Sequence, residues 1–402
     1  MINFSKAGLL VISAMSLAFT GCQKASPPSS SSTESAATQP ATPTSINGED
    51  IVTLKRQKTG DDSQPQFLTA TVLPGRGMNL FQVTAFVPGR GEVEVLASPS
   101  LADATKVLIG TGDDATGNKS FSLGGAFLAP FANRIVGKVS ADGKSVATEW
   151  HGIPMTLNAN WKGKNPGATP HAMHGLILDS KATVVATMPV ADGQEVTGHI
   201  DAGDFDGHWF SKTNFTIVES LSGKAVEVTV TARNVGDKPE PMGIGWHPYF
   251  AIPSGDRTQA RLHVPGDMRT EVNNYDDVFA TGKLLPVKGT PYDFTAPGGK
   301  PLDKQFLDDN WTNLKRTDGG AVSEIIDPAA KYGLRIVAVS PQISAIQVYA
   351  PVEKNFIALE PQFNLNDPFG KEWKTDTKMV TLKPGEAVTW KVRLELFVPE
   401  TK

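Results

Sequence analysis

The chain has 402 residues, a formal net charge of -4 and a single cysteine, Cys22. The near-balanced charge gives no indication of a nucleic-acid partner, and one cysteine excludes internal disulfides and any multi-cysteine metal site. With 38 Gly, 29 Pro and 8% aromatic residues, the composition is typical of a turn-rich β protein rather than a helical one. The length allows a large core and by itself suggests two or three domains, although large β folds often form one.

Residues 1–22 have the pattern of a lipoprotein signal peptide. Lys6 precedes an apolar run from Ala7 to Thr20, which is too short to span a bilayer as a permanent helix. The run ends in Phe19-Thr20-Gly21-Cys22, which resembles a bacterial lipobox, where the cysteine becomes the lipidated first residue. Phe19 departs from the aliphatic residue usual at its position. The alternative is an ordinary secreted protein with a stray thiol at Cys22.

Residues 23–46 are predicted to be a flexible tether, because they are rich in Ser, Thr, Pro and Ala and carry almost no charge. A lipid on Cys22 would anchor the protein by burying its acyl chains in a membrane. Gln23 in place of an aspartate indicates the outer membrane, by analogy with enteric lipoproteins. We therefore expect an exported bacterial envelope protein that faces the periplasm and contacts the membrane only through its lipid.

Residues 47–402 are predicted to form one all-β domain. The clearest strand is Ala225 to Ala232, where valines alternate with Glu and Thr, the period-two pattern of a half-buried strand. No amphipathic helix longer than two turns, no repeat and no nucleotide-binding fingerprint follows the signal segment. The sequence therefore predicts a large antiparallel β-sandwich. Further predicted strands are Phe81 to Phe86, Glu92 to Leu96, Ala182 to Met188, Phe215 to Glu219, Gly333 to Val339, Ile343 to Tyr349, Phe356 to Leu359 and Val388 to Leu396.

Two polar clusters precede the middle of the chain. Arg134 follows Asn133 among apolar residues, and its guanidinium is either a fork of donors for ligand oxygens or part of a surface salt bridge. His171 and His174 are three residues apart, but a β-rich context without a clustered third ligand disfavours a metal. A ligand contact from His174, with Gly175 allowing close backbone approach, is the preferred interpretation.

Three more polar positions lie in the second half. Pro248 restricts His247 to an extended backbone, at what we expect to be a strand end, although a packed core histidine is the alternative. Asp308 and Asp309 precede Trp311, a combination found in sugar sites and in ordinary turns. Glu360 ends an apolar strand, and a buried carboxylate must be paired or functional. Its raised pKa would suit a general base.

These motifs occur in the same order in the aldose 1-epimerases (galactose mutarotases), which the chain resembles from about Asn47 to Pro399. The resemblance implies a many-stranded supersandwich, a free aldohexose such as glucose or galactose as substrate, and no cofactor or metal. The matching motifs are Asn133-Arg134-Ile135, His174-Gly175, His247-Pro248-Tyr249-Phe250, Thr281-Gly282 with Gly289 to Phe294, Leu307-Asp308-Asp309 and Leu359-Glu360-Pro361-Gln362.

The resemblance also implies roles. His247 corresponds to the family's general acid and Glu360 to its general base. The substrate-binding residues are then Asn133, Arg134, His174 and Asp308. We expect His247 and Glu360 to lie several ångströms apart on either side of a hexose ring, without a hydrogen bond between them.

Some assignments remain open at this stage. Asp309 competes with Asp308, and His171 competes with His174. Leu176 replaces the family's second glycine after the histidine, so the loop around the ligand could differ. Trp161, Trp246 and Trp311 are candidates for stacking on the sugar or are plain core aromatics.

Three other functions are consistent with part of this pattern. The first is a non-catalytic carbohydrate-binding envelope lipoprotein on the same scaffold. The second is a glycoside-cleaving enzyme, which would use two carboxylates such as those of Asp308 and Glu360. The third is a sugar-phosphate mutarotase, which the expected export disfavours because phosphorylated sugars are mostly cytosolic.

Overall fold

The computed structural model describes residues 42–400. The predicted signal peptide, Cys22 and most of the predicted tether lie outside the described residues. The end of the tether prediction is wrong, because β1 (Ser45–Ile46) pairs with β2 (Glu49–Asp50) and the Ile46 side chain is buried. Within residues 42–400, no helix is both long and apolar enough to cross a membrane.

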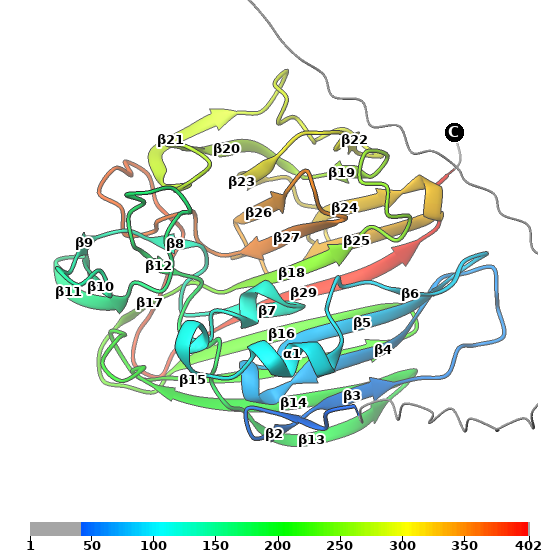
Figure 1. Ribbon diagram of the computed structural model, residues 1–402, viewed down its shortest axis with the longest axis horizontal. Coiled ribbons are helices and arrows are strands. Elements are labelled where there is room, and N and C mark those ends of the chain that lie inside the picture. The colour runs from blue at the N-terminus through cyan, green and yellow to red at the C-terminus, as the bar shows by residue number, and fades with distance from the viewer. Residues whose placement is uncertain (1–41, 401–402) are drawn as a thin grey trace, which may run out of the picture. The chain divides into compact units, whose positions relative to one another are not determined.

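Two large antiparallel sheets make up most of the fold (Figure 1). The first has nine strands in the order β13 (Thr183–Val190), β14 (Gly193–Gly203), β15 (Thr213–Ser222), β16 (Ala225–Asn234), β29 (Ala387–Phe397), β25 (Tyr332–Ala338), β24 (Ala321–Asp327), β19 (Arg261–His263) and β22 (Lys300–Pro301). The second has eleven, in the order β21 (Ala280–Pro286), β20 (Gly266–Val272), β23 (Leu307–Leu314), β26 (Ala345–Ala350), β27 (Phe356–Gln362), β18 (Gly245–Ala251), β7 (Gly125–Leu128), β5 (Asn79–Val87), β4 (Gln66–Leu73) and β3 (Val52–Lys55), with β6 (Gly91–Glu94) also on β5.

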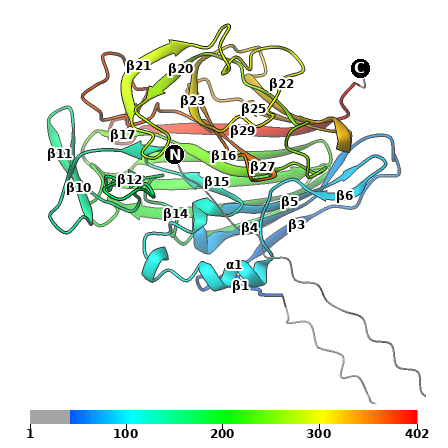
Figure 2. The ribbon, with the colours of Figure 1, turned by 45° about the horizontal axis from the view of Figure 1, so that its top comes forward.

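In the part of the chain that the structure describes, small sheets, one short α-helix and four 3-10 turns lie outside the two large sheets. One small sheet, β9 to β11, lies at the end of the molecule opposite β6 in both ribbon views (Figures 1 and 2). The α-helix α1 (Leu101–Val107) begins at Ser100, whose hydroxyl accepts a hydrogen bond from the Asp103 amide. The remaining small elements are β8 (Arg134–Ile135), β9 (Lys138–Val139), β10 (Ser145–Trp150), β11 (Ile153–Asn158), β12 (Ala172–Met173), β17 (Glu240–Met242), β28 (Val380–Leu382), η1 (Pro74–Arg76), η2 (Gly112–Asp114), η3 (Ser120–Ser122) and η4 (Pro328–Ala330).

The main core lies between the two large sheets, which confirms the predicted sandwich. In β16 the side chains of Val226, Val228 and Val230 are fully buried, while the alternate residues face outward. They share one apolar cluster with Leu54 and Val83 of the eleven-stranded sheet. Burying this alternating apolar face is what the period-two pattern of the sequence provides.

The centre of the eleven-stranded sheet is buried on both of its faces. Nearly every residue of β18, β26 and β27 is buried. One face packs on the sandwich core. The other faces η3, β8 and the segments 161–164, 173–174 and 275–278. That second face carries polar side chains, and it positions the candidate site.

Candidate active site

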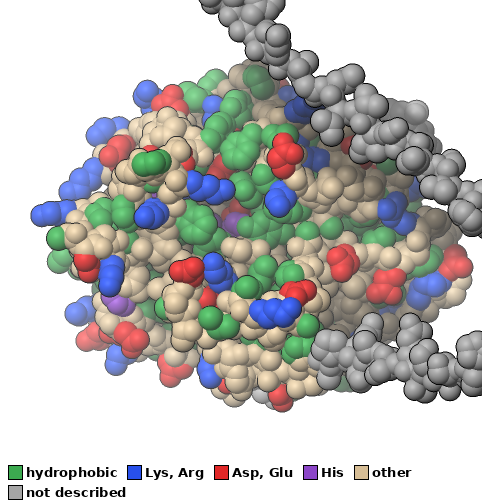
Figure 3. Space-filling view, viewed as in Figure 1, with side chains coloured by type: hydrophobic (Ala, Val, Ile, Leu, Met, Phe, Trp, Pro, Cys, Tyr) green, Lys and Arg blue, Asp and Glu red, His purple; other side chains and the backbone are tan. Residues whose placement is uncertain are grey.

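A pocket of about 440 Å³ opens over the buried second face of β18, β26 and β27. In the space-filling view a histidine is visible in a hollow ringed mostly by hydrophobic side chains (Figure 3). A volume of this size is in the usual range for small-molecule sites. The pocket brings together all six residues predicted from the sequence, namely Asn133, Arg134, His174, His247, Asp308 and Glu360.

The polar floor of the pocket follows from strand register. Gln347 of β26 lies opposite Glu360 of β27. Two residues further along β26, Tyr349 lies opposite Asp308 of β23, which starts a second row of paired residues across the sheet. Tyr249 lies across from Ala358 in this second row. Side chains directly opposite in antiparallel strands face the same side, so consecutive strands present their polar groups to one pocket.

Two prolines interrupt the ladder where the proposed acid and base meet. The register between β18 and β27 is the same on both sides of a gap from Trp246 to Pro248, so His247 lies opposite Glu360. Pro248 and Pro361 have no N–H groups to donate across this gap. The His247 Nε2 atom is 3.3 Å from Oε1 of Glu360.

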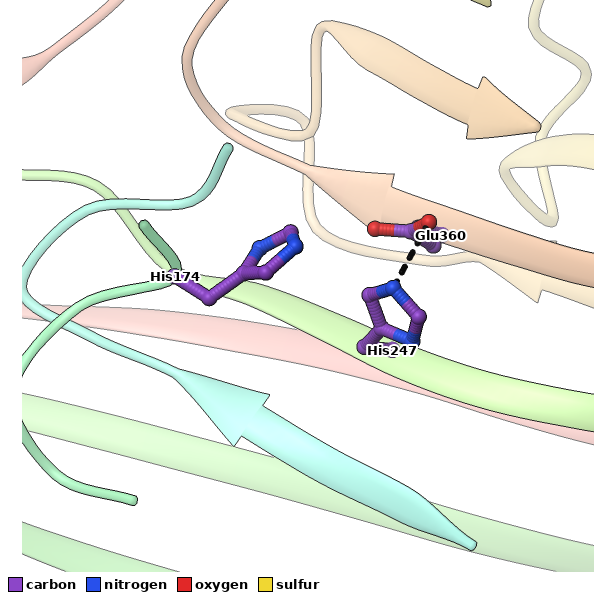
Figure 4. Close-up of side chains that lie close together, drawn as sticks. All are labelled: His174, His247 and Glu360. Carbon is purple, nitrogen blue, oxygen red and sulfur yellow. Dashed lines mark ion pairs between the residues drawn. The ribbon is translucent and has the colours of Figure 1, made fainter. Parts of the chain in front are cut away.

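This geometry corrects two expectations. His247 lies within β18 rather than at a strand end. The prediction that a hexose ring separates His247 from Glu360 is also wrong, because the two side chains are in direct contact (Figure 4). The expectation failed because it assumed that they lie on opposite walls, whereas neighbouring strands place them side by side on one floor.

A ribbon of two short strands brings the remaining histidine to the floor. β8 pairs with β12, and just beyond this pairing the His174 amide donates to the Asn133 carbonyl at 2.8 Å. Asn133 and His174 both have left-handed backbones, with φ of 64° and 59°. Gly175 also has a positive φ, and a Cβ there would lie 2.3 Å from the Ala129 carbonyl oxygen. The lack of a side chain at Gly175 therefore allows the backbone to approach Ala129, rather than a ligand as expected.

Four polar side chains form a closed ring beside this floor. The Asp308 carboxylate accepts from Gln347 at 2.6 Å and from Arg134 at 3.4 Å. The Asn133 side chain donates through Nδ2 to Gln347 at 3.0 Å and accepts through Oδ1 from Arg134 at 3.1 Å. Arg134 is therefore a buried, oriented donor rather than a surface salt bridge. Asn133, predicted to bind substrate, lines the pocket, but its side-chain amide is hydrogen-bonded to Gln347 and Arg134.

The structure distinguishes between the competing residues by position. Asp308 lines the pocket, while Asp309 lies behind it and accepts from Arg269 at 2.7 Å and from the Tyr275 hydroxyl at 2.8 Å. His174 lines the pocket, whereas His171 is fully buried against Phe279.

Leu176 and two of the three tryptophans take no part in this pocket. Leu176 packs in a separate apolar cluster and is not a lining residue. Trp246 and Trp311 are fully buried core residues. Trp161 alone of the three lines the pocket.

Burial dominates the electrostatics of the floor. Desolvation raises the pKa of the Glu360 carboxyl well above its usual range, assisted by Asp308 and opposed by Arg134. Desolvation lowers the pKa of the His247 imidazole to about 4 and that of His174 well below its usual value. The floor therefore favours uncharged side chains, with a proton on Glu360 and none added to His247.

The same three side chains could also receive a metal ion. His174, His247 and Glu360 each offer one ligand atom, and these atoms lie within 4.8 Å of one another. Figure 4 shows the His174 ring directed toward the other two side chains. Two imidazoles and a carboxylate are a donor set that zinc takes in proteins, which the sequence did not lead us to expect. The reaction proposed below does not require a metal.

Several pocket residues were missed in the sequence. Gln347, Tyr249 and Tyr349 line the floor. The Phe121 ring packs beside both His174 and His247, with centroids 4.8 and 5.9 Å away. The signal for Gln347 and Tyr349 was present, because they alternate along a predicted strand. It could not be used without the register that places this strand beside Glu360.

The sequence profile described as Aldose 1-epimerase matches residues 95–395 of this chain. The chain belongs to the aldose 1-epimerase family. Among curated proteins, none matches the sequence. The matched region contains every side chain of the pocket floor.

Solved structures share the aldose 1-epimerase fold at low identity. A galactose mutarotase-like protein from Clostridium acetobutylicum is 17% identical, with a TM-score of 0.66, over 86% of this chain and 98% of that one. An aldose epimerase homologue from C. elegans is 18% identical, with a TM-score of 0.63, over 86% and 99%. Galactose 1-epimerase from Lactobacillus acidophilus is 15% identical, with a TM-score of 0.59, over 87% and 99%. These likenesses confirm the all-β supersandwich.

Proposed function

We propose that the protein interconverts the α and β anomers of free aldohexoses such as glucose or galactose. Membership of the aldose 1-epimerase family supports this activity. The observation that carries it is the contact between His247 and Glu360 on the floor of a pocket, next to the buried guanidinium of Arg134. Anomer exchange requires a proton donor and a proton acceptor that can both reach the two oxygens bonded to C1, and adjacent side chains on one pocket floor are suited to this.

The reaction opens the sugar ring and closes it on the other face. In the proposed opening, the Glu360 carboxylate takes the proton of the C1 hydroxyl while the His247 imidazolium protonates the ring oxygen. The C1–O5 bond breaks, a C1 carbonyl forms, and rotation about C1–C2 precedes closure by the reverse steps. Both oxygens are bonded to C1, so two adjacent side chains can serve them from one side. Each such proton transfer contributes on the order of 10²–10⁴-fold.

The buried environment supports the opened state. Ring opening converts a carboxylate and an imidazolium into a carboxylic acid and a neutral imidazole. This is the protonation state that burial favours, since it raises the pKa of Glu360 and lowers that of His247. Because burial also favours the neutral pair before the reaction, a proton first passes from Glu360 to His247, and ring opening then returns the two side chains to the neutral state. Arg134 acts in the opposite sense by favouring the Glu360 carboxylate before the reaction.

The other floor residues are proposed to bind sugar oxygens. Arg134 and His174 can donate hydrogen bonds to sugar oxygens, and the Asp308 carboxylate can accept them from sugar hydroxyl groups. The ring formed with Gln347 and Asn133 fixes the positions of Arg134 and Asp308 before a ligand enters. It also disfavours glycoside cleavage by Asp308 and Glu360, because Asp308 is already an acceptor to two partners.

Polarimetry on freshly dissolved α-glucose and α-galactose tests the proposal. The wild-type protein should speed the approach to equilibrium rotation, and His247→Ala and Glu360→Gln should remove most of the acceleration. His199→Gln and Glu353→Gln, at exposed positions, serve as matched controls that keep it. A wild-type rate no faster than buffer would refute the enzyme. Sugar binding by calorimetry without acceleration would instead support the non-catalytic binding protein.

We further propose that Cys22 is lipidated and anchors the protein in the bacterial outer membrane. Sucrose-gradient fractionation of the membranes tests this proposal. The lipobox-like Phe19-Thr20-Gly21-Cys22 sequence supports this. Wild-type protein should be recovered with outer-membrane markers, and Cys22→Ser should be released in soluble form. Recovery of the wild type in the soluble fraction would contradict lipid anchoring.

A further inference from the structure

Arg134 is carried by a very short strand. Within residues 42–400, β8 pairs only with β12, and each of these strands has two residues, so neither belongs to a large sheet. The residue before Arg134 is Asn133, whose backbone is left-handed with a φ of 64°. A residue other than glycine keeps this conformation only where its surroundings enforce it. Contacts from outside the two-stranded ribbon must therefore help to fix this segment.

Two side chains of one loop are hydrogen-bonded to the backbone on either side of Arg134. The Asn364 side chain accepts from the Ala132 amide at 3.2 Å and donates to the Ala132 carbonyl at 2.8 Å. The Asp367 carboxylate accepts from the Val136 amide at 3.0 Å. Both side chains are buried. The chain is thus held two residues before Arg134 and two residues after it.

The loop that carries these side chains begins at the end of β27, the strand of Glu360. Gln362 is the last residue of β27, and its side chain donates to the Asn364 carbonyl at 2.6 Å. Glu360 lies two residues earlier in the same strand. The position of Arg134 is therefore linked to that of Glu360 through a short, hydrogen-bonded piece of chain.

Asn364 and Asp367 themselves lie outside the pocket. Neither is among the residues that line it, so neither is placed to touch a sugar there. The Asn364 amide is closely packed, because a Cβ added to Gly243 would overlap its Oδ1 atom. The Asp367 turn is held by the Trp373 indole, which donates to the Asp367 carbonyl at 3.1 Å. Rigid side chains behind a site are what fixes the groups inside it.

We propose that Asn364 and Asp367 are positioning residues that fix Arg134 for the reaction. This inference rests on the proposed function. By holding the backbone on both sides of Arg134, they keep its guanidinium beside the Asp308 carboxylate. There the guanidinium can donate to sugar oxygens, and its charge opposes the rise in the pKa of the Glu360 carboxyl.

Steady-state mutarotation kinetics with glucose test the proposal. Asn364→Ala and Asp367→Ala should each raise the KM about tenfold, the size of one lost buried hydrogen bond, with a smaller change in kcat. Asp367→Asn keeps an oxygen acceptor for the Val136 amide and should keep the KM within about threefold of the wild type. Asn234→Ala is the matched control, because Asn234 is also fully buried, donates to two backbone carbonyls and lies outside the pocket. It should leave the KM unchanged.

A double variant distinguishes an effect through Arg134 from a general loss of packing. In an Arg134→Ala background, Asn364→Ala should change the KM by less than about twofold, because the group that it positions is gone. An effect of equal size in both backgrounds overturns the proposal, as does a wild-type KM in both alanine variants. Thermal unfolding verifies that each variant is folded. If Asn364→Ala does not fold, Asn364→Asp replaces it, since it keeps the acceptor and loses only the donor, and a smaller rise in KM is expected.

Calorimetry with glucose in a Glu360→Gln background separates this proposal from the proposed enzyme, because it measures binding without turnover. Suppose that the wild type binds glucose without accelerating mutarotation, and that Asn364→Ala weakens the binding. That result would refute the enzyme and support the positioning of Arg134. Acceleration by the wild type with unchanged binding in both alanine variants would refute the positioning alone. A wild type that neither binds nor converts the sugar would refute both.

Discussion

The two large sheets use their strands differently. In the nine-stranded sheet, β15 and β16 alternate strictly between buried and more exposed residues. In the eleven-stranded sheet, β18, β26 and β27 are buried on both faces, and one of these faces is polar. A polar face is stable under cover only where its groups have partners. The covered polar face of the eleven-stranded sheet is therefore suited to a reaction site that excludes water.

Two buried glutamates show what this difference means. Glu219 of β15 faces the interior between Val196 and Val228, and among the described residues neither of its oxygens has a hydrogen-bond partner. Burial raises the pKa of Glu219 as it does that of Glu360. Only Glu360 has an imidazole at 3.3 Å. A raised pKa alone thus does not identify a catalytic carboxyl, and a partner that exchanges its proton is also needed.

Replacing each glutamate by methionine would test this distinction most strongly. Glu360→Met should lower the mutarotation rate on the order of 10²–10⁴-fold, because it removes one proton-transfer group. Glu219→Met should leave the rate unchanged. Polarimetry measures both, and a large loss of rate in Glu219→Met would show that the two regions are not functionally separate.

Zn²⁺ should inhibit mutarotation by binding near Glu360 and should not bind near Glu219. Among residues 42–400, only the region around Glu360 offers two imidazoles and a carboxylate within 4.8 Å, so Zn²⁺ should compete with the sugar there. His174→Gln should raise the Zn²⁺ concentration needed for inhibition, whereas His199→Gln should not. EDTA alone should leave the activity unchanged. Activity lost to EDTA and restored by Zn²⁺ would instead indicate a metal-dependent enzyme.

Breaking the polar ring should have a smaller effect on activity. Gln347→Leu removes one partner from both Asp308 and Asn133, and an unpartnered buried group costs about 1–3 kcal/mol. Because Gln347 positions sugar-binding groups, we expect the KM to rise about tenfold with a smaller change in kcat. Steady-state kinetics measure the two values. A loss confined to kcat would contradict a positioning role.

The smallest effect is expected on stability, and it depends on pH. The folded protein keeps the Glu219 proton that the unfolded chain releases near its ordinary pKa of 4.5. Stability from this group is therefore present at low pH and is lost as pH rises toward the folded-state pKa. Glu219→Met should raise the unfolding temperature by about 2 °C or more at pH 8, and less at pH 5. An equal shift at both pH values, or a shift in Glu353→Met, would contradict this account.

The sequence predicted the sheets better than the distances within the site. Alternation of Val226, Val228 and Val230 is local information, and the structure confirms the strand that it predicts. The six floor residues were found through motifs. Their spacing was predicted incorrectly, because the contact between His247 and Glu360 depends on the register of β18 and β27. The choice of Asp308 over Asp309 likewise depends on which face of β23 is covered.

The floor is assembled from strands that are far apart in the chain. β18, β23, β26 and β27 begin at residues 245, 307, 345 and 356, and they become four consecutive strands only in the finished sheet. Such long-range pairing is slow and cooperative in folding. After dilution from denaturant, enzymatic activity should therefore return only in the final kinetic phase, after most of the strand signal in circular dichroism has recovered.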